Sequence, residues 1–226
     1  MSLDPLAQLY AAAAAFLLTH FIPSTPLRAP LVKALGQRGY TALYSLVAFV
    51  TLGWMIWAYG KAPVEPVWPG LKLLPAILMP FSFVLFACGL LSRNPTIVGA
   101  GKLLESADPA RGIIRVTRHP LMWSFMLWAA AHVLARGEMK ATVFFGAFLL
   151  LAALGALLID RRKEKTAGED WRRFAAATSY FPFLAIAQGR NKFVAAEIGW
   201  RNPALGLALY ALLFWFHPRW FGARPY

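Results

Sequence analysis

The sequence predicts an all-α integral membrane protein, a bundle of about six transmembrane helices with a cytoplasmic amphipathic segment. Two observations lead to this prediction. Hydrophobic residues make up 59% of the 226 residues and charged residues only 15%, whereas soluble domains contain about 45–50% and about 25% respectively. The apolar residues also gather in continuous runs long enough to cross the roughly 30 Å hydrocarbon core of a bilayer, at about 1.5 Å of helix rise per residue.

Polar or basic connections separate the predicted spans. In chain order the spans cover residues 5–22, 40–59, 73–92, 120–136, 141–160 and 203–217. The connection 161–201 is the largest segment outside the membrane. Its first part, from Arg161 to Phe174, alternates basic residues with occasional aromatic ones, which is typical of a helix that lies in the membrane interface.

The distribution of basic residues predicts the orientation. Of the 23 Lys and Arg residues, seventeen lie in the connections after the first, third and fifth spans, and six lie on the opposite side. By the positive-inside rule those connections are cytoplasmic, and both termini lie in the periplasm of a bacterial inner membrane. The net charge of +13 is therefore explained by the membrane orientation of the chain. Membrane lipids are the expected partners, because basic residues beside a membrane contact anionic headgroups. No soluble module carries nucleic-acid readout residues, so a nucleic-acid partner is not expected.

The candidate functional residues gather around the fourth span. Arg118, His119 and Pro120 open it, and His132 follows 13 residues after His119. An ionisable side chain costs roughly 2.5–3.5 kcal/mol at the centre of a bilayer helix, so imidazoles there usually line a site. The Walker, G-x-G-x-x-G, H-E-x-x-H and G-x-S-x-G patterns are absent, so phosphate, dinucleotide, zinc-protease and hydrolase sites are not expected.

Several spaced motifs together resemble one known family. They are His20 with Pro23, the segment Leu35-Gly36-Gln37-Arg38-Gly39-Tyr40, Arg118-His119-Pro120 with Trp128 and His132, and Phe144-Phe145-Gly146. In this order, over most of the chain, they resemble the NnrU family of bacterial membrane proteins. The resemblance implies a single transmembrane domain over residues 1–226.

The resemblance also implies a function. The NnrU family is needed for expression of nitrite and nitric oxide reductase activity. The resemblance therefore implies denitrification enzymes as partners. One role that it implies is to support the maturation of those enzymes without catalysing a reaction. The family is related to zeta-carotene isomerase, a haem b membrane enzyme that turns a cis double bond to trans. Carried over to this chain, the haem-iron ligands are His20 and His132. Ala129 stands where that isomerase has a cysteine three residues before its later histidine, so thiolate ligation is not expected.

The predicted topology favours a different histidine pair. It places His20 near the cytoplasmic end of the first span and His132 about 20 Å from His119 toward the outside. By this count His20 and His119 lie near one face, while His132 and His217 lie near the other. The haem ligands are then either His20 with His132 or His20 with His119. Each histidine is also open to a simpler interpretation, an interfacial residue that hydrogen-bonds a carbonyl or a headgroup.

A second enzyme class uses a similar motif. Membrane methyltransferases of the isoprenylcysteine carboxyl type carry Arg-His-Pro at the cytoplasmic mouth of a helix, followed by an acidic, aromatic segment that helps to hold S-adenosylmethionine. The comparable residues here are Asp160, Glu164, Glu169, Asp170, Trp171 and Tyr180. Arg118, next to the exposed N–H groups of a helix start, would suit a carboxylate. The glycine and tyrosine usual after this motif are absent, and Met122 and Ser124 stand nearby instead.

Overall fold

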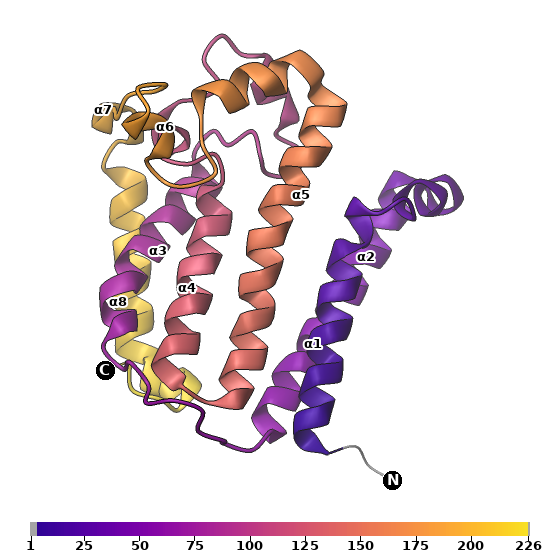
Figure 1. Ribbon diagram of the computed structural model, residues 1–226, viewed down its shortest axis with the longest axis vertical. Coiled ribbons are helices and arrows are strands. Elements are labelled where there is room, and N and C mark those ends of the chain that lie inside the picture. The colour runs from indigo at the N-terminus through magenta and orange to yellow at the C-terminus, as the bar shows by residue number, and fades with distance from the viewer. Residues whose placement is uncertain (1–3, 226) are drawn as a thin grey trace. The chain divides into compact units, whose positions relative to one another are not determined.

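The computed structural model describes residues 4–225 as helices joined by loops (Figure 1). The helices are α1 (Pro5–Phe21), α2 (Arg28–Lys61), α3 (Leu74–Leu91), α4 (Pro120–Arg136), α5 (Met139–Ala177), α6 (Leu184–Ala187), α7 (Ala195–Ile198) and α8 (Arg201–Phe221). Three short 3₁₀ turns, η1 (Ile22–Ser24), η2 (Gly101–Glu105) and η3 (Gly112–Arg115), lie in the connections. Within the described residues there is no strand, and one isolated bridge joins Pro66 to Glu138. The all-α prediction is confirmed.

Among residues 4–225, four helical segments are long and apolar enough to cross a membrane. They are Pro5–Ser24, Arg28–Lys61, Leu74–Leu91 and Met139–Ala177. The other two predicted spans, 120–136 and 203–217, also fold as helices, α4 and α8. The protein therefore has several apolar helices of membrane-spanning length, and the count of six spans stays a prediction.

The described residues divide into two compact units. Residues 4–71 with 132–151 form the first unit, and residues 72–131 with 152–225 form the second. The first unit contains α1, α2, the end of α4 and the beginning of α5. The second contains α3, most of α4, the remainder of α5, and α6 to α8. A single domain over the whole chain stays a prediction.

In the first unit, α1 packs against α2 and the beginning of α5. The α1 helix begins where the Asp4 carboxylate accepts hydrogen bonds from the amides of Leu6 and Ala7, at 3.0 and 3.1 Å, which satisfies donors that a helix start leaves free. Its small and apolar side chains then form a shared core with the other two helices. The buried members are Leu9, Ala12, Ala13, Phe16, Met55, Ala58, Ala62 and Ala147.

In the second unit, α3 and α8 approach closely at Gly206. A Cβ atom at this position would lie 2.5 Å from the Phe83 carbonyl oxygen and 2.9 Å from the Val84 Cα, both on α3. Glycine is thus required there because the facing atoms are backbone and have little freedom to move. Small residues at such crossings are the usual means by which membrane helices come into close contact.

We expect Gly206→Ala to destabilise the protein by about 1–3 kcal/mol, the usual effect of overpacking. The control is Gly53→Ala, since a Cβ at Gly53 meets nothing within 4 Å. Alanine should stabilise that helical position slightly, because it restricts the unfolded chain. Thermal unfolding in detergent measures the stability change in both variants. Equal melting temperatures for the two variants would contradict the close approach of α3 and α8.

The segment after residue 160, where the sequence predicts an interfacial helix, begins as a helix. It continues α5 to Ala177, with a break at Gly168, whose φ is +50°. Trp171 and Phe174 are buried in the core of the second unit, together with Cys88 and Ile114. The apolar side of this segment is therefore covered by protein, and its placement in the membrane interface stays a prediction.

An ion-pair network fastens the loop before α4 to α7. The Glu197 carboxylate accepts hydrogen bonds from the Arg115 Nε at 2.7 Å and from the Gly112 amide at 2.9 Å. These bonds, with the Arg115 one the stronger, lower the pKa of Glu197 to about 2. Gly112 has a φ of +61°, which favours glycine at this turn. The network holds η3, and with it the start of α4, in a fixed position.

Candidate functional site

His20 lies in the last turn of α1, in the first unit, with one ring nitrogen already engaged. Its Nδ1 is 2.6 Å from the carbonyl oxygen of Phe16, one turn earlier. Because a carbonyl oxygen can only accept, Nδ1 carries the proton and Nε2 carries the lone pair. The half-buried imidazole also packs against the Phe16 ring, at 4.1 Å between centroids, and meets Tyr44 edge-on at 5.9 Å. An Nδ1–H bonded to a carbonyl is the usual way in which proteins orient a histidine that ligates a metal.

His132 belongs to the same unit. Its imidazole stacks on the Phe145 ring, with centroids 4.8 Å apart and planes inclined by 28°. Four phenylalanine rings in contact then lead from His132 to His20. In order they are Phe145, Phe144, Phe148 and Phe16. The two histidines named by the family resemblance therefore occupy the two ends of one aromatic row.

The row also indicates how far apart the two imidazoles lie. Phe16 contacts Phe148, and His20 follows Phe16 by four residues, whereas Phe145 precedes Phe148 by three. Because α1 and the beginning of α5 run in the same direction (Figure 1), these steps give an axial offset of roughly 10 Å at about 1.5 Å per residue. Two axial imidazoles on one iron have nitrogens only about 4 Å apart, since each metal–nitrogen bond is about 2 Å. At this offset the imidazoles of His20 and His132 are too far apart to bind one iron as they stand, so this ligand pair stays a prediction that requires the two side chains to approach each other.

Arg118 and His119 lie in the second unit and share a carboxylate, that of Asp160 on α5. The His119 Nε2 donates to Asp160 Oδ1 at 2.6 Å. The Arg118 guanidinium reaches Asp160 Oδ2 with Nε at 2.9 Å and with Nη2 at 2.8 Å. The His119 side chain is fully buried, and the other two are only 16% exposed. Such a buried charge cluster is stable only because its members are paired.

The loops around this cluster are also fastened by hydrogen bonds. The Thr117 hydroxyl and the Trp123 indole N–H both donate to the Tyr180 carbonyl oxygen, at 2.7 and 2.8 Å. The Tyr180 hydroxyl donates to the Ala153 carbonyl oxygen at 3.1 Å, and its ring meets the His119 ring edge-on. The segment 178–181 is therefore held against the start of α4, over the cluster.

One atom of the cluster remains unsatisfied. The buried Nδ1 of His119 has no hydrogen-bond partner within residues 4–225. With Nε2 already engaged by Asp160, this is the nitrogen that would have to bind iron in the predicted pair of His20 with His119. Because Nε2 donates to Asp160, the Nδ1 of His119 carries a lone pair, as the Nε2 of His20 does. The choice between His132 and His119 as the second ligand stays a prediction.

His217 follows the simpler interpretation made from the sequence. Its Nδ1 donates to the Ala223 carbonyl oxygen at 2.7 Å, and its ring packs on Phe221 near the end of α8. In the part of the chain that the structure describes, no group of three or more His, Cys, Asp or Glu side chains could hold a metal ion.

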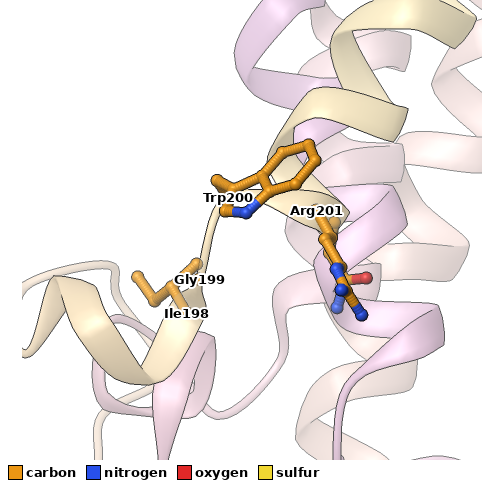
Figure 2. Close-up of a pocket in the computed structure, with 5 residues that line it drawn as sticks. Ile198, Gly199, Trp200 and Arg201 are labelled. Atoms are coloured by element: carbon orange, nitrogen blue, oxygen red, sulfur yellow. The ribbon is translucent and has the colours of Figure 1, made fainter.

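An open pocket of about 360 Å³ lies where α7 meets α8. Its lining comprises Ile198, Gly199, Trp200, Arg201 and Asn202 (Figure 2). Trp200 is 75% exposed. An exposed tryptophan beside an arginine at a helix start is typical of a membrane-interface anchor. The pocket brings together no acid, base or nucleophile, so it is not a candidate active site.

The comparisons with known proteins agree with the motifs. The family model described as NnrU protein matches residues 8–225. The chain belongs to the NnrU family. No solved structure matches this NnrU protein.

Two curated relatives are chloroplastic 15-cis-zeta-carotene isomerases. The one from Arabidopsis thaliana is 44% identical over 83 residues, which is 35% of this chain and 22% of the relative. The one from Zea mays is 37% identical over 81 residues, which is 36% of this chain and 22% of the relative. The matched stretch of the NnrU protein thus spans about a fifth of the length of these relatives.

The contacts of Arg118 do not favour the methyltransferase alternative. That hypothesis needs a guanidinium that is available to an anionic carboxylate at the helix start. In the NnrU protein, Asp160 already supplies a carboxylate to Arg118, and the Thr178 carbonyl oxygen accepts a further hydrogen bond at 3.4 Å. The Arg118 guanidinium also lies over the Trp171 ring, at 6.0 Å from its centroid. These contacts use Arg118 to join parts of the protein to one another.

The sequence analysis missed the contacts of Asp160 with Arg118 and His119. Asp160 was expected only as part of an acidic segment, not as the partner of Arg118 and His119. Its position offered a signal, since it is an acid at the end of a long apolar run, where an unpaired carboxylate is costly. An acid in that position predicts a basic partner elsewhere in the bundle.

Proposed function

We propose that this NnrU protein binds haem b through His20, with His132 as the second axial ligand, and acts on the double-bond geometry of an apolar polyene. The observation that supports the proposal best is the hydrogen bond from His20 Nδ1 to the Phe16 carbonyl oxygen. It fixes the tautomer and leaves Nε2 as the ligating atom. When bound, haem supplies an iron whose reactivity depends on its axial ligands and on the polarity around it.

The surroundings of His20 suit a flat apolar cofactor. Its imidazole lies between the Phe16 and Tyr44 rings, and the aromatic row continues to His132. Aromatic side chains offer large apolar faces on which a macrocycle packs well. The side chains near His20 are therefore of the kind expected around a haem.

The proposed substrate class follows from the relatives and from the membrane. Both isomerases described above are named for 15-cis-zeta-carotene, a substrate of those proteins. In this chain α2 carries exposed apolar side chains, among them Leu46, Phe49 and Trp57. Such surfaces suit contact with lipid, from which an apolar polyene would reach the protein directly. Ala129 in place of cysteine means that the proposed chemistry uses no thiolate at that position.

The isomerase part of the proposal has a direct test. Membranes that contain the haem-loaded protein should convert 15-cis-zeta-carotene to an isomer with a trans central double bond, while His20→Ala membranes should leave it unchanged. Chromatographic separation of the isomers measures the conversion. An unchanged substrate with haem-loaded wild-type protein would contradict the isomerase activity and leave haem binding as a separate result.

The role in denitrification belongs to the same proposal. The family resemblance implies support for the expression or maturation of nitrite and nitric oxide reductases, with those enzymes as partners. A haem-bearing membrane protein is chemically suited to work beside respiratory enzymes.

We also propose the orientation that the basic residues predict. In a bacterial inner membrane, residues 161–201 face the cytoplasm and both ends of the chain face the periplasm. The terminal residues 1–3 and 226 lie outside the described residues. Reporters fused to the C-terminus should be active when they require export and inactive when they require the cytoplasm. The opposite pattern would overturn the orientation.

A further inference from the structure

The beginning of α2 folds back on itself at Gly36. This residue has a φ of +68° and a ψ of 164°, which interrupts the helix and favours glycine. The fold-back brings Arg28 close to residues that follow the break. The Arg28 Nη2 donates to the Gln37 Oε1 at 3.3 Å, and the guanidinium carbon lies 5.7 Å from the centroid of the Tyr40 ring. A cation is thereby placed over a tyrosine in the first unit.

The hydroxyl group of this tyrosine is unsatisfied. Tyr40 is 7% exposed, and its buried hydroxyl has no hydrogen-bond partner among residues 4–225. Leaving a buried polar group unpaired destabilises the folded protein, so proteins rarely retain one without a reason. A ligand that accepts a hydrogen bond from Tyr40 would remove this destabilisation.

Tyr40 is connected to the candidate haem ligand. Its ring stacks on Tyr44, with centroids 6.3 Å apart and planes inclined by 19°, and Tyr44 meets His20 edge-on at 5.9 Å. Arg28, Tyr40, Tyr44 and His20 therefore form a continuous series of contacts. At one end of the series the Arg28 guanidinium lies beside Tyr40, whose hydroxyl is unpaired. At the other end the His20 imidazole has a lone pair on Nε2.

The protein supplies no anion to this cation from the same helices. Residues 5–64, which include α1 and α2, contain no Asp or Glu. A guanidinium binds a carboxylate strongly, often through two parallel hydrogen bonds, and a tyrosine hydroxyl can donate a third. The missing partner of Arg28 and Tyr40 thus has the chemistry of a carboxylate that belongs to a ligand.

We infer that Arg28 and Tyr40 bind a carboxylate of the tetrapyrrole held by His20, which for haem b is a propionate. This inference rests on the proposed haem binding and adds to it the residues that recognise the polar edge of the cofactor. The aromatic row receives the apolar macrocycle, and Arg28 with Tyr40 receives the charge. A tetrapyrrole without free carboxylates should therefore bind less tightly than haem.

The test compares haem with its dimethyl ester, whose propionates carry no charge. Each is titrated into the detergent-purified, haem-free full-length protein, and the Soret absorbance gives the dissociation constant. Wild-type protein should bind haem at least tenfold more tightly than the ester. Arg28→Ala should weaken haem binding about tenfold and Tyr40→Phe severalfold, and neither should change binding of the ester. The unchanged ester affinity shows that the variants remain folded.

Lys33→Ala is the matched control, because Lys33 is an exposed cation on the same fold-back. It should bind haem and the ester as wild type does. Arg28→Ala and Tyr40→Phe with an unaltered preference for haem would overturn the inference while haem binding stands. If wild-type protein binds neither compound, the proposed haem binding itself fails, and the inference fails with it.

Discussion

Asp160→Ala should destabilise the protein by about 3–5 kcal/mol, the usual effect of removing one partner from a buried ion pair. The alanine would leave the Arg118 guanidinium and the His119 imidazole, both largely buried, without the carboxylate that they share. The expected result is a much lower melting temperature in detergent and less protein in the membrane. Thermal unfolding followed by tryptophan fluorescence measures the first, and quantitative immunoblotting the second.

Asp108→Ala is the control for this prediction. Asp108 also accepts a hydrogen bond from an arginine, Arg115, at 2.9 Å, but its side chain is 48% exposed. Exposed ion pairs contribute about 0–1 kcal/mol, and Arg115 would keep its bonds to Glu197. The melting temperature should therefore hardly change. Similar losses in Asp108→Ala and Asp160→Ala would argue that the Asp160 cluster is not a buried ion pair.

His20→Ala should remove most of the bound haem while the protein still inserts into the membrane. The substitution deletes the imidazole whose Nε2 is available, and a haem protein depends on its axial ligands to retain the cofactor. The absorbance ratio of the Soret band to the protein band measures this loss. His217→Ala is a close control, because His217 is also half-buried and also donates from Nδ1 to a backbone carbonyl oxygen. The His217→Ala variant should retain its haem.

The two remaining histidines separate the ligand pairs. If His132 is the second ligand, His132→Ala should shift the ferrous spectrum from six-coordinate toward five-coordinate, high-spin haem. In that case His119→Ala should leave the spectrum of any folded protein unchanged, because the His119 imidazole would not ligate the iron. A shift in His119→Ala alone would favour the pair that the predicted topology suggested. A haem spectrum like that of the wild type in His20→Ala would exclude both ligand pairs, because His20 belongs to each of them.

The helices were predictable because the membrane imposes length on apolar runs. The predicted spans 5–22 and 120–136 correspond closely to α1 and α4. The fifth span was expected to end at residue 160, but α5 continues to Ala177. Apolarity ends at residue 160, whereas helix propensity does not, because Arg, Lys, Glu and Ala are all good helix formers. The end of the apolar run is therefore not the end of the helix.

The site was less predictable because its contacts join residues far apart in the chain. Asp160 lies 41 residues after His119, and no sequence pattern specifies which basic residue an acid at a membrane boundary will meet. Tyr40 belongs to a motif that the sequence analysis quoted, yet the lack of a partner for its hydroxyl depends on the surrounding packing. The His20 tautomer similarly depends on the position of the Phe16 carbonyl group.

Haem binding at His20 is the central claim, and a pyridine haemochrome assay tests it most directly. The assay is applied to wild-type protein, His20→Ala and His217→Ala, each produced with ample haem and purified in mild detergent. Wild-type protein and His217→Ala should each contain about one haem b per chain, and His20→Ala should contain far less. Wild-type protein without haem b, or His20→Ala with the wild-type amount, would contradict the account.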